Sequence, residues 1–254
     1  MSLKVTYIGH ATLLIEWDGL NILTDPVFSK RVFGVFKRLA PLAYDPTTLP
    51  KLDAILLSHA HYDHLDLPSF KYISSEVPIL IPEGMSGAIA SFVNNPVIEL
   101  TTWSKYNVAP DCEICAVPAM HPGGRLIIPY RYTKCHGYMI SKNGETVYFT
   151  GDTGYDSHFS NWKDLFKIKL AFLPMARIRK KWFQGKNRHL DLEELIQCWQ
   201  DLGQPDWIPI HWGVFFRSSN HGLQAAEYLK RRAEPDPLLK EKMHLLQPGE
   251  FLKL

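Results

Sequence analysis

The residues from Ser58 to Asp66, with the sequence SHAHYDHLD, place three histidines and two aspartates directly after the apolar run DAILL. Imidazole nitrogens and carboxylate oxygens are the ligands that zinc, iron and manganese accept in proteins. His59 and His61 are two residues apart and therefore lie on one side of an extended loop, whereas Asp63 and His64 follow where the chain turns. These four side chains can supply parts of two adjacent metal sites but cannot complete them. We therefore expect further ligands from loops elsewhere in the chain.

Three more residues of metal-binding type follow apolar runs. His121 follows ICAVPAM, Asp152 stands in FTGDTGY after the run VYFT, and His211 follows DWIPI. Strands of an open α/β sheet present the residues at their carboxyl ends to one edge, where ligands bind. A single histidine after a strand is usually a core or capping residue, but three such positions beside a dense cluster are hard to explain by structure alone. The pattern predicts a metal centre assembled from separate loops.

Hairpins and interspersed helices must position these residues. Asp18–Gly19 and Asn143–Gly144 are typical of tight hairpin turns between strands. Apolar residues at helical spacing predict helices over 84–93, 190–203 and 222–233, the second ending at Gly203. This mixture indicates an α/β sandwich, with sheets in the middle and helices outside, forming one domain over residues 1–254. Strands are expected over 4–8, 11–17, 20–24, 53–57, 78–81, 136–141, 145–150, 169–173 and 206–210.

The composition of the chain narrows the class of protein. With 254 residues, 46% hydrophobic residues and a formal net charge of +2, it fits a folded protein without a bulk attraction to nucleic acid, and we expect no nucleic-acid partner. No apolar run approaches the ~18 residues of a membrane-spanning helix, and the N-terminal stretch lacks the pattern of a signal peptide, so a cytoplasmic location is expected. Cys112 and Cys115 form a CxxC without a second pair at zinc-ribbon spacing, which favours packed thiols in a strand.

The ordered set of HxHxDH at 59–64, then His121, Asp152 and His211, resembles the metallo-β-lactamase superfamily of dinuclear metallohydrolases. The resemblance extends from about Val5 to Trp212. GHATLLIEWDGLNILTDPVFS, SHAHYDHLD, FTGDTGY, WF followed by HLDLEE, and IHWGVF are similar to the branch that contains N-acylphosphatidylethanolamine-hydrolysing phospholipase D. A metallo-β-lactamase-like fold is a four-layer αβ/βα sandwich, in which helices flank two mixed β-sheets.

The resemblance implies a dinuclear centre of two divalent metal ions, with Zn2+ expected and Mn2+ or Fe2+ as alternatives. Two such ions share a water and lower its pKa toward about 7, which provides a metal-bridging hydroxide as the nucleophile. Asp63 is expected to orient this hydroxide as well as bind metal. Asp25 would support the HxHxDH loop through hydrogen bonds to ligands, although a turn residue before Pro26 is an equal interpretation of the local sequence. The implied ligands are His59, His61 and His121 for one ion, Asp63, His64 and His211 for the other, and Asp152 for both.

The resemblance favours hydrolysis of a phosphodiester, with a phospholipid as one candidate substrate. The alternatives are a lactonase or ester hydrolase acting on a small phosphorylated substrate, and a non-catalytic metal-binding protein. His189 aligns with a family histidine that approaches the substrate, so we predict a catalytic role for it, with helix capping as the alternative. A basic segment beside the site would attract phosphate if it is not merely solvated, and its candidate substrate contacts are Arg177, Arg179, Lys181 and Trp182.

The stretch from Phe28 to Leu42 alternates aromatic and aliphatic residues with lysines and arginines. It is interpreted either as a helix packed on the domain or as a peripheral contact with an anionic membrane. Pro122 and Gly123 replace the tryptophan and serine of the phospholipase-like relatives, so the substrate is not carried over with the ligands. The role of His10 and the oligomeric state stay open. The remaining histidines, His136, His158, His221 and His244, are assigned to structure or surface.

Overall fold

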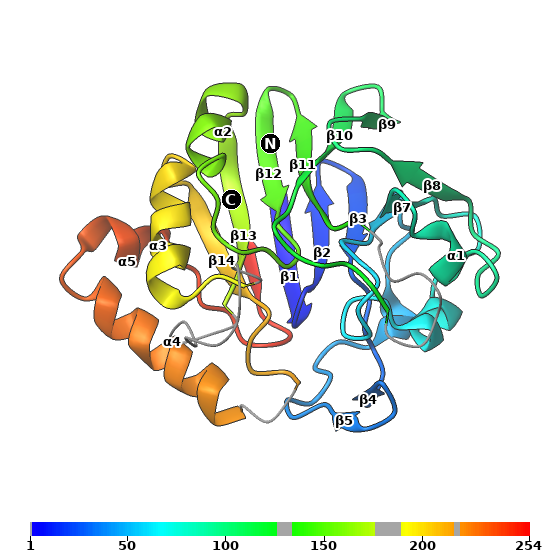
Figure 1. The fold of residues 1–254 in the computed structure, drawn as a ribbon, viewed down its shortest axis with the longest axis horizontal. Coiled ribbons are helices and arrows are strands. Elements are labelled where there is room, and N and C mark those ends of the chain that lie inside the picture. Colours follow the sequence, from blue (N-terminus) through cyan, green and yellow to red (C-terminus); the bar gives the residue numbers. More distant parts are fainter. Residues whose placement is uncertain (1, 126–133, 176–188, 216–218) are drawn as a thin grey trace.

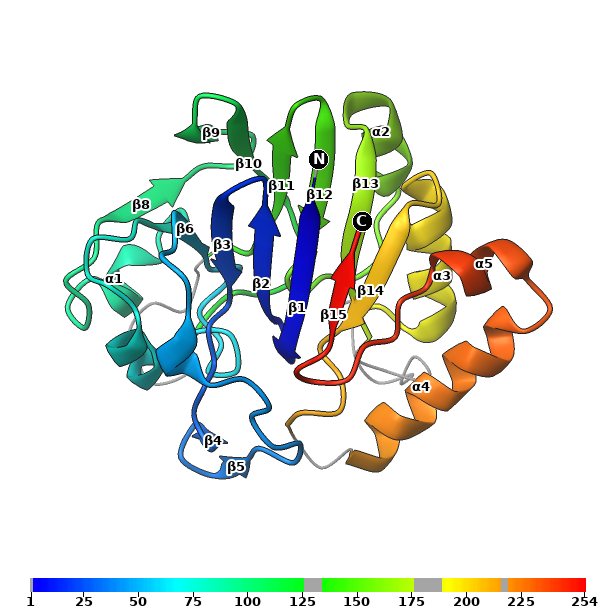
Figure 2. The same cartoon turned by 180° about the vertical axis from the view of Figure 1, so that it is seen from behind.

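Two mixed β-sheets stack face to face in the computed structural model, which describes residues 2–125, 134–175, 189–215 and 219–254 (Figures 1 and 2). In the first sheet, the successive pairs from β15 through β1 and β2 to β3 are antiparallel. The successive pairs from β3 through β6 and β7 to β8 are parallel. The strands, in spatial order, are β15 (Phe251–Lys253), β1 (Leu3–Gly9), β2 (Thr12–Trp17), β3 (Leu20–Thr24), β6 (Ala54–Leu56), β7 (Ile79–Pro82) and β8 (Val97–Leu100).

The second sheet combines parallel strands β14, β13 and β12 with antiparallel strands β11, β10 and β9. In spatial order they are β14 (Asp206–Ile210), β13 (Ile168–Pro174), β12 (Glu145–Phe149), β11 (His136–Lys142), β10 (Cys112–Pro118) and β9 (Lys105–Ala109). The helices are α1 (Ser86–Ile89), α2 (Phe159–Leu165), α3 (Leu192–Asp201), α4 (Ser219–Ala233) and α5 (Pro237–Lys242), with short 3-10 helices at Pro46–Thr48 and Leu67–Tyr72.

Three apolar layers hold the sandwich together. Side chains from both sheets, such as Tyr7 and Phe149, form the central layer. The outer face of the second sheet packs against α2, α3, α4 and α5, whereas the outer face of the first sheet packs against α1 and the Leu67–Tyr72 helix. Figure 1 shows α2 to α5 on one flank of the molecule and α1 on the other. The predicted four-layer sandwich is confirmed.

Local sequence signals account for the turns and for the main helix. Asp18, Gly19, Asn143 and Gly144 all have positive φ, as the two tight hairpin turns require. Helix α3 begins after Asp191, whose carboxylate accepts hydrogen bonds from the backbone N–H groups of Glu193 and Glu194. The Glu194 side chain accepts the Asp191 N–H in return, which completes a capping box.

Two expected helices are corrected by the structure. The helix expected over 84–93 is reduced to Ser86–Ile89, because Gly84, with positive φ, precedes it, Gly87 weakens it, and the turn toward the β8 strand ends it. The stretch 28–42 forms no helix at all. It contains a two-stranded ribbon, β4 (Arg31–Val32) paired with β5 (Phe36–Lys37), since valine and phenylalanine favour strands and Gly34 permits a tight reversal.

The CxxC lies within strand β10, and its two thiols are buried. Cys112 packs in the layer between the sheets, whereas Cys115 packs on the outer face against the helices. Three residues apart on a strand, the two side chains point to opposite faces, so they form neither a disulfide nor a chelate. The packed-thiol prediction is confirmed. In the ranges that the structure describes, no helix has both the length and the apolar character needed to cross a membrane.

Candidate metal centre

The candidate ligands stand at the carboxyl ends of strands from both sheets. His59 follows β6, His121 follows β10, Asp152 follows β12, and His211 comes directly after β14. The ends of these strands meet at one edge of the sandwich, from which the β4–β5 ribbon projects in Figures 1 and 2. His211 occupies the left-handed backbone region, with φ of 63°, and this sharp turn aims its side chain back across the edge.

One group of side chains surrounds the end of β6. The His61 Nδ1 atom lies 2.8 Å from His59 Nε2 and 3.2 Å from His121 Nε2. The Asp152 Oδ2 atom lies 4.0 Å from His59 Nε2 and 3.8 Å from His121 Nε2. One ligand atom from each of these four residues therefore falls within 4.8 Å of the others.

A second group shares the same carboxylate. The Asp152 Oδ2 atom lies 3.4 Å from His64 Nε2 and 3.2 Å from His211 Nε2. The Asp63 Oδ2 atom lies 3.6 Å from His211 Nε2 and 3.9 Å from His64 Nε2. A single oxygen of Asp152 thus faces the Nε2 atoms of four histidines that come from three separate loops. The structure brings together all seven residues that the sequence predicts as ligands.

The donor atoms fit divalent cations. A neutral imidazole has one ring nitrogen with a lone pair, and this is the nitrogen through which histidine binds a divalent cation. Among the described residues, His64 Nε2, His211 Nε2 and Asp152 Oδ1 are buried without a hydrogen-bond partner. Buried polar atoms in folded proteins are almost always satisfied. These unsatisfied nitrogens and the carboxylate oxygen are the ligand types that a divalent cation binds, so the residues present fit a metal centre.

Burial and charge divide the histidines into two sets. Burial and the neighbouring imidazoles hold the pKa of His59 well below its usual range and lower the pKa of His61 to about 4. Burial also disfavours charge on His211, but the carboxylates of Asp152 and Asp63 outweigh it and raise the pKa of His211 to about 9. For His64, the carboxylates of Asp152 and Asp25 outweigh burial in the same way and raise its pKa well above 6.5. The first set is therefore neutral and ready to donate lone pairs, whereas the second set must release protons when it binds a cation.

Asp25 lies beneath the HxHxDH loop and is fully buried. Its carboxylate accepts hydrogen bonds from the Ser58 backbone N–H at 2.7 Å and the Ser58 hydroxyl at 2.6 Å, and it lies 2.6 Å from His64 Nδ1. This contact fixes the His64 ring so that Nε2 faces Asp152. Asp25 also has a left-handed backbone, with φ of 31°, so its two interpretations describe one residue that turns the chain and supports the loop.

His10, whose role the sequence left open, joins the second group. Its Nε2 atom lies 3.0 Å from Asp63 Oδ2, and its ring centroid is 4.1 Å from that of His211. The His10 carbonyl accepts the backbone N–H of His211 at 2.7 Å, and the His10 N–H donates to the Tyr7 hydroxyl. His10 is 2% exposed and has a φ of 61°. The end of β1 is therefore folded against two candidate ligands.

His189 reaches the open side of the cluster. Its Nδ1 atom lies 3.6 Å from Asp152 Oδ2, and its ring centroid is 4.6 Å from that of His121. It is partly exposed, and Asp191 caps the following helix, so the capping alternative for His189 is wrong. The predicted substrate contacts Arg177, Arg179, Lys181 and Trp182 lie outside the described residues.

Residues that the sequence reading missed hold the loops against one another. Thr153 links the loops of His121 and His189, because its hydroxyl accepts the Met120 N–H and its carbonyl accepts the Leu190 N–H. A Cβ atom on Gly151, which has φ of 57°, would lie 2.3 Å from the Ser58 Cβ atom, so only glycine fits there. Arg125 donates to the carbonyls of Ala60 and Leu65 and thereby closes the HxHxDH loop. The spacing of ligands gives no signal for such contacts.

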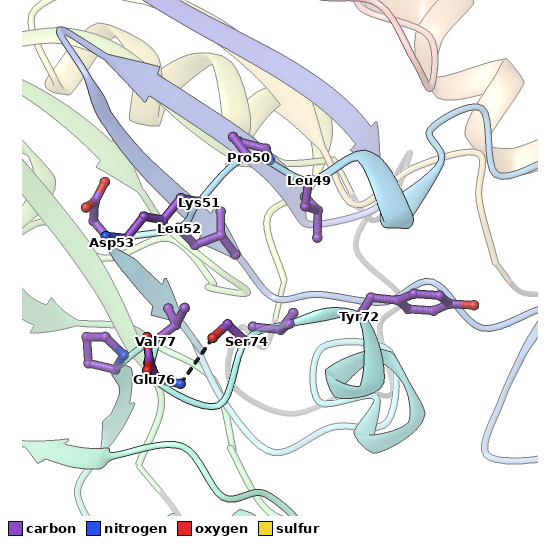
Figure 3. Close-up of a pocket in the computed structure, with 11 residues that line it drawn as sticks. Leu49, Pro50, Lys51, Leu52, Asp53, Tyr72, Ser74, Glu76 and Val77 are labelled. Atoms are coloured by element: carbon purple, nitrogen blue, oxygen red, sulfur yellow. Dashed lines mark hydrogen bonds between the residues drawn. The ribbon is translucent and has the colours of Figure 1, made fainter.

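The other described histidines lie away from this centre. His136 contacts Thr102, His158 packs on Phe159 and Trp162, and His244 lies 2.8 Å from Asp206. The side chain of His221 lies outside the described residues. The hollow in Figure 3 is lined by residues such as Lys51, Asp53 and Glu76. It lies at the amino end of β6, opposite the histidine cluster, and no metal-binding group is found there among the described residues.

Comparison with known proteins agrees with this geometry. The sequence profile of the beta-lactamase superfamily domain matches residues 20–212. The chain belongs to this superfamily. The predicted membership of the metallo-β-lactamase-fold metallohydrolases is thereby confirmed.

Relatives within the superfamily include a mitochondrial N-acyl-phosphatidylethanolamine-hydrolyzing phospholipase D of Saccharomyces cerevisiae, 35% identical over 90% of this chain and 51% of the relative. The chain therefore spans about half the length of that protein. A metal-dependent hydrolase of Methanopyrus kandleri is 29% identical over 98% of both chains. Among solved structures, a metallo hydrolase from Ignicoccus hospitalis has a TM-score of 0.74 at 23% identity and covers the whole chain and 99% of its own. This likeness shows the fold alone.

Proposed function

We propose that the protein is a dinuclear metal-dependent hydrolase that cleaves phosphodiesters. The observation that carries the proposal is the position of Asp152 Oδ2 within 3.2–4.0 Å of Nε2 atoms of four histidines. A carboxylate surrounded in this way suits a ligand shared by two cations. His59, His61 and His121 would hold one ion, and Asp63, His64 and His211 the other. When bound, such a pair lowers the pKa of a water to about 7 and draws charge from a phosphoryl oxygen.

Two side chains would act on the reacting atoms. Asp63 would accept a hydrogen bond from the attacking water and so aim its lone pair at phosphorus. The proximity of Asp63 to His10 and His211 lowers its pKa well below the usual range against the effect of burial, so the carboxylate stays an acceptor at neutral pH. His189, on the open side of the cluster, would contact the substrate at the leaving-group side. Zinc is the expected metal, because the set is rich in imidazoles, and Mn2+ or Fe2+ would occupy the same donors.

The preference for a phosphodiester rests on relatives. The yeast and Caenorhabditis elegans relatives are named as phospholipases D that hydrolyse N-acyl-phosphatidylethanolamine. Carrying this activity to the present chain is part of the proposal, with a phospholipid as one candidate substrate. The replacement of the relatives' tryptophan and serine by Pro122 and Gly123 next to His121 alters the rim rather than the ligands.

Zinc-loaded protein assayed on a chromogenic phosphodiester and on N-acylphosphatidylethanolamine tests the proposal. Hydrolysis of either substrate is expected, with loss of activity after chelation and recovery when zinc is added back. The control is the variant His136→Asn, which removes a buried histidine outside the cluster. Inactivity on both substrates, with faster hydrolysis of a phosphorylated lactone, would replace the phosphodiesterase proposal with the lactonase alternative. A single tightly held ion without turnover on any of the three would indicate a non-catalytic metal-binding protein.

A further inference from the structure

The β4–β5 ribbon, defined here as residues 30–37, is unusual in what it exposes. The exposed fraction is 40% for Phe33, 65% for Val35 and 37% for Phe36. Phe33 also has a left-handed backbone, with φ of 52°, which bulky residues rarely adopt. Neither burial nor backbone preference accounts for an aromatic residue at this position. Strain at Phe33 and exposure across the ribbon tip are features of surfaces that serve an external contact.

The charges of the ribbon have one sign. Lys30, Arg31 and Lys37 are exposed, and no aspartate or glutamate occurs between Asp25 and Asp45. In the described parts of the chain, none of these three cations forms a salt bridge with a carboxylate, and the Arg31 guanidinium donates a hydrogen bond to the backbone carbonyl of Val35. A surface that combines protruding apolar side chains with unpaired cations is complementary to a layer of anionic head groups above acyl chains.

The base of the ribbon is anchored, so its orientation is fixed. The buried Arg38 guanidinium donates to the carbonyls of Val27 and Ser29 and lies 4.7 Å from the centre of the Phe215 ring. The Leu39 N–H donates to the Val214 carbonyl at 2.7 Å. One arginine thus holds the ribbon from below, while the three neighbouring cations face solvent.

The ribbon also touches the metal centre. The Phe33 ring centroid lies 4.5 Å from that of Tyr62, which stands between His61 and Asp63 in the HxHxDH loop. Tyr62 stacks in turn on the Arg125 guanidinium at 3.8 Å. Figures 1 and 2 show the ribbon projecting from the edge of the sandwich at which the ligand-bearing strands end. A surface bound to the ribbon would therefore lie beside the opening of the site.

We propose that the ribbon docks the protein on anionic phospholipid bilayers, with Phe33, Val35 and Phe36 entering the interface and Lys30, Arg31 and Lys37 binding head groups. A lipid substrate would make this docking useful, and in that respect the inference rests on the proposed function. Binding itself requires no turnover. Phosphatidylglycerol is the probe, because it supplies anionic head groups without being a specific ligand.

Co-sedimentation of the 254-residue chain with vesicles tests the docking. Binding is expected to vesicles of phosphatidylglycerol mixed with phosphatidylcholine and to be much weaker on phosphatidylcholine alone. The triple variant Lys30→Gln, Arg31→Gln, Lys37→Gln should lower the partition coefficient on the order of 100-fold, since each cation near an anionic surface contributes about 1 kcal/mol. Val35→Ser with Phe33→Ser should lower it roughly tenfold through lost apolar burial.

Matched controls distinguish a specific role of the ribbon from a general effect of removing apolar surface or positive charge. Leu165→Ser removes an apolar side chain of equal exposure, 64%, from α2, and Lys230→Gln, Arg231→Gln, Arg232→Gln removes three positive charges from α4. Both controls should bind vesicles as the unaltered protein does. Failure of the unaltered protein to bind anionic vesicles would overturn the proposal, as would equal binding by the ribbon variants. A concentration-dependent dimer that Val35→Ser abolishes, without vesicle binding, would show that the ribbon contacts a second copy instead.

The vesicle-binding assay and the hydrolysis assay test the two proposals independently. Binding to vesicles without hydrolysis of either phosphodiester would support the docking surface and contradict the proposed reaction. Hydrolysis of a soluble phosphodiester without binding to vesicles would support the proposed reaction and contradict the docking surface.

Discussion

The floor of the metal centre and the β4–β5 ribbon stand at the same edge of the sandwich, yet they are built by opposite means. On the floor, Asp25, Ser58 and His64 are completely buried, and the Asp25 carboxylate makes three contacts of 2.6–2.7 Å to the other two. On the ribbon, Phe33 and Val35 are exposed, and the hydrogen bonds of Arg38 hold only the base, while Phe33 keeps a ring contact to Tyr62. Positions on the floor are therefore determined by several partners at once, whereas the ribbon tip has few internal contacts and leaves much of its apolar surface accessible from outside the molecule.

Asp152→Asn should have the largest effect, because it removes the charge shared by both groups of histidines. Hydrolysis is expected to fall by at least about 1,000-fold, corresponding to the several kcal/mol that a metal pair contributes to the transition state. Metal content measured by inductively coupled plasma mass spectrometry should fall with it. Full metal content and full activity in the variant would show that Asp152 is not a metal ligand.

Asp25→Asn should weaken zinc binding by about 10- to 100-fold without removing a ligand, since supporting hydrogen bonds orient the imidazoles that bind metal. Competition with a chromogenic chelator measures this affinity. Asp53→Asn is the matched control. The Asp53 carboxylate also accepts a backbone N–H, that of Asn21 at 2.8 Å, but it lies at the amino end of β3, whereas Asp25 follows the carboxyl end. Equal effects of the two changes would mean that Asp25 only stabilises the fold.

His10→Asn should weaken the binding of one of the two ions by about tenfold and spare the other, because asparagine tolerates the left-handed backbone but is too short to reach Asp63. Titration with Co2+, followed by its visible absorption, separates the two binding events. His10→Gln should restore part of the loss, and His136→Asn should change neither event. Weakening of both ions alike would contradict a role limited to Asp63 and His211.

Val35→Ser should produce the smallest change, within about 0.5 kcal/mol of the free energy of unfolding, because the side chain is already exposed. Ile55→Ala, in the buried β6 strand that leads to His59, should cost about 2–5 kcal/mol. Urea unfolding of both variants measures the contrast. A loss at Val35 as large as that at Ile55 would show that the ribbon belongs to the packed core.

Sequence reading succeeded where chemistry leaves a pattern along the chain. The hairpins at Asp18–Gly19 and Asn143–Gly144 and the helix after Asp191 follow from local rules. The seven predicted ligands converge because the four loops that carry them follow the carboxyl ends of apolar strands. The position of His10 could not be predicted in this way, since its contacts to Asp63 and His211 join residues 53 and more positions apart in the chain.

The same reading failed where tertiary packing or backbone geometry decides. The segment 28–42 has aliphatic, aromatic and basic residues that fit a helix as well as a strand, and only the pairing of β4 with β5 selects the ribbon. The need for glycine at position 151 arises from its approach to Ser58, a contact between the two sheets that no local pattern records. Left-handed backbone at Asp25 and His211 is equally hidden from composition and spacing.

A crystal structure of the zinc-loaded protein, with anomalous difference maps collected at the zinc absorption edge, tests the shared role of Asp152 most directly. The expected result is a pair of peaks on either side of the Asp152 carboxylate, one beside His59, His61 and His121 and the other beside Asp63, His64 and His211. A single peak, or peaks that leave Asp152 without contact to zinc, would contradict the account.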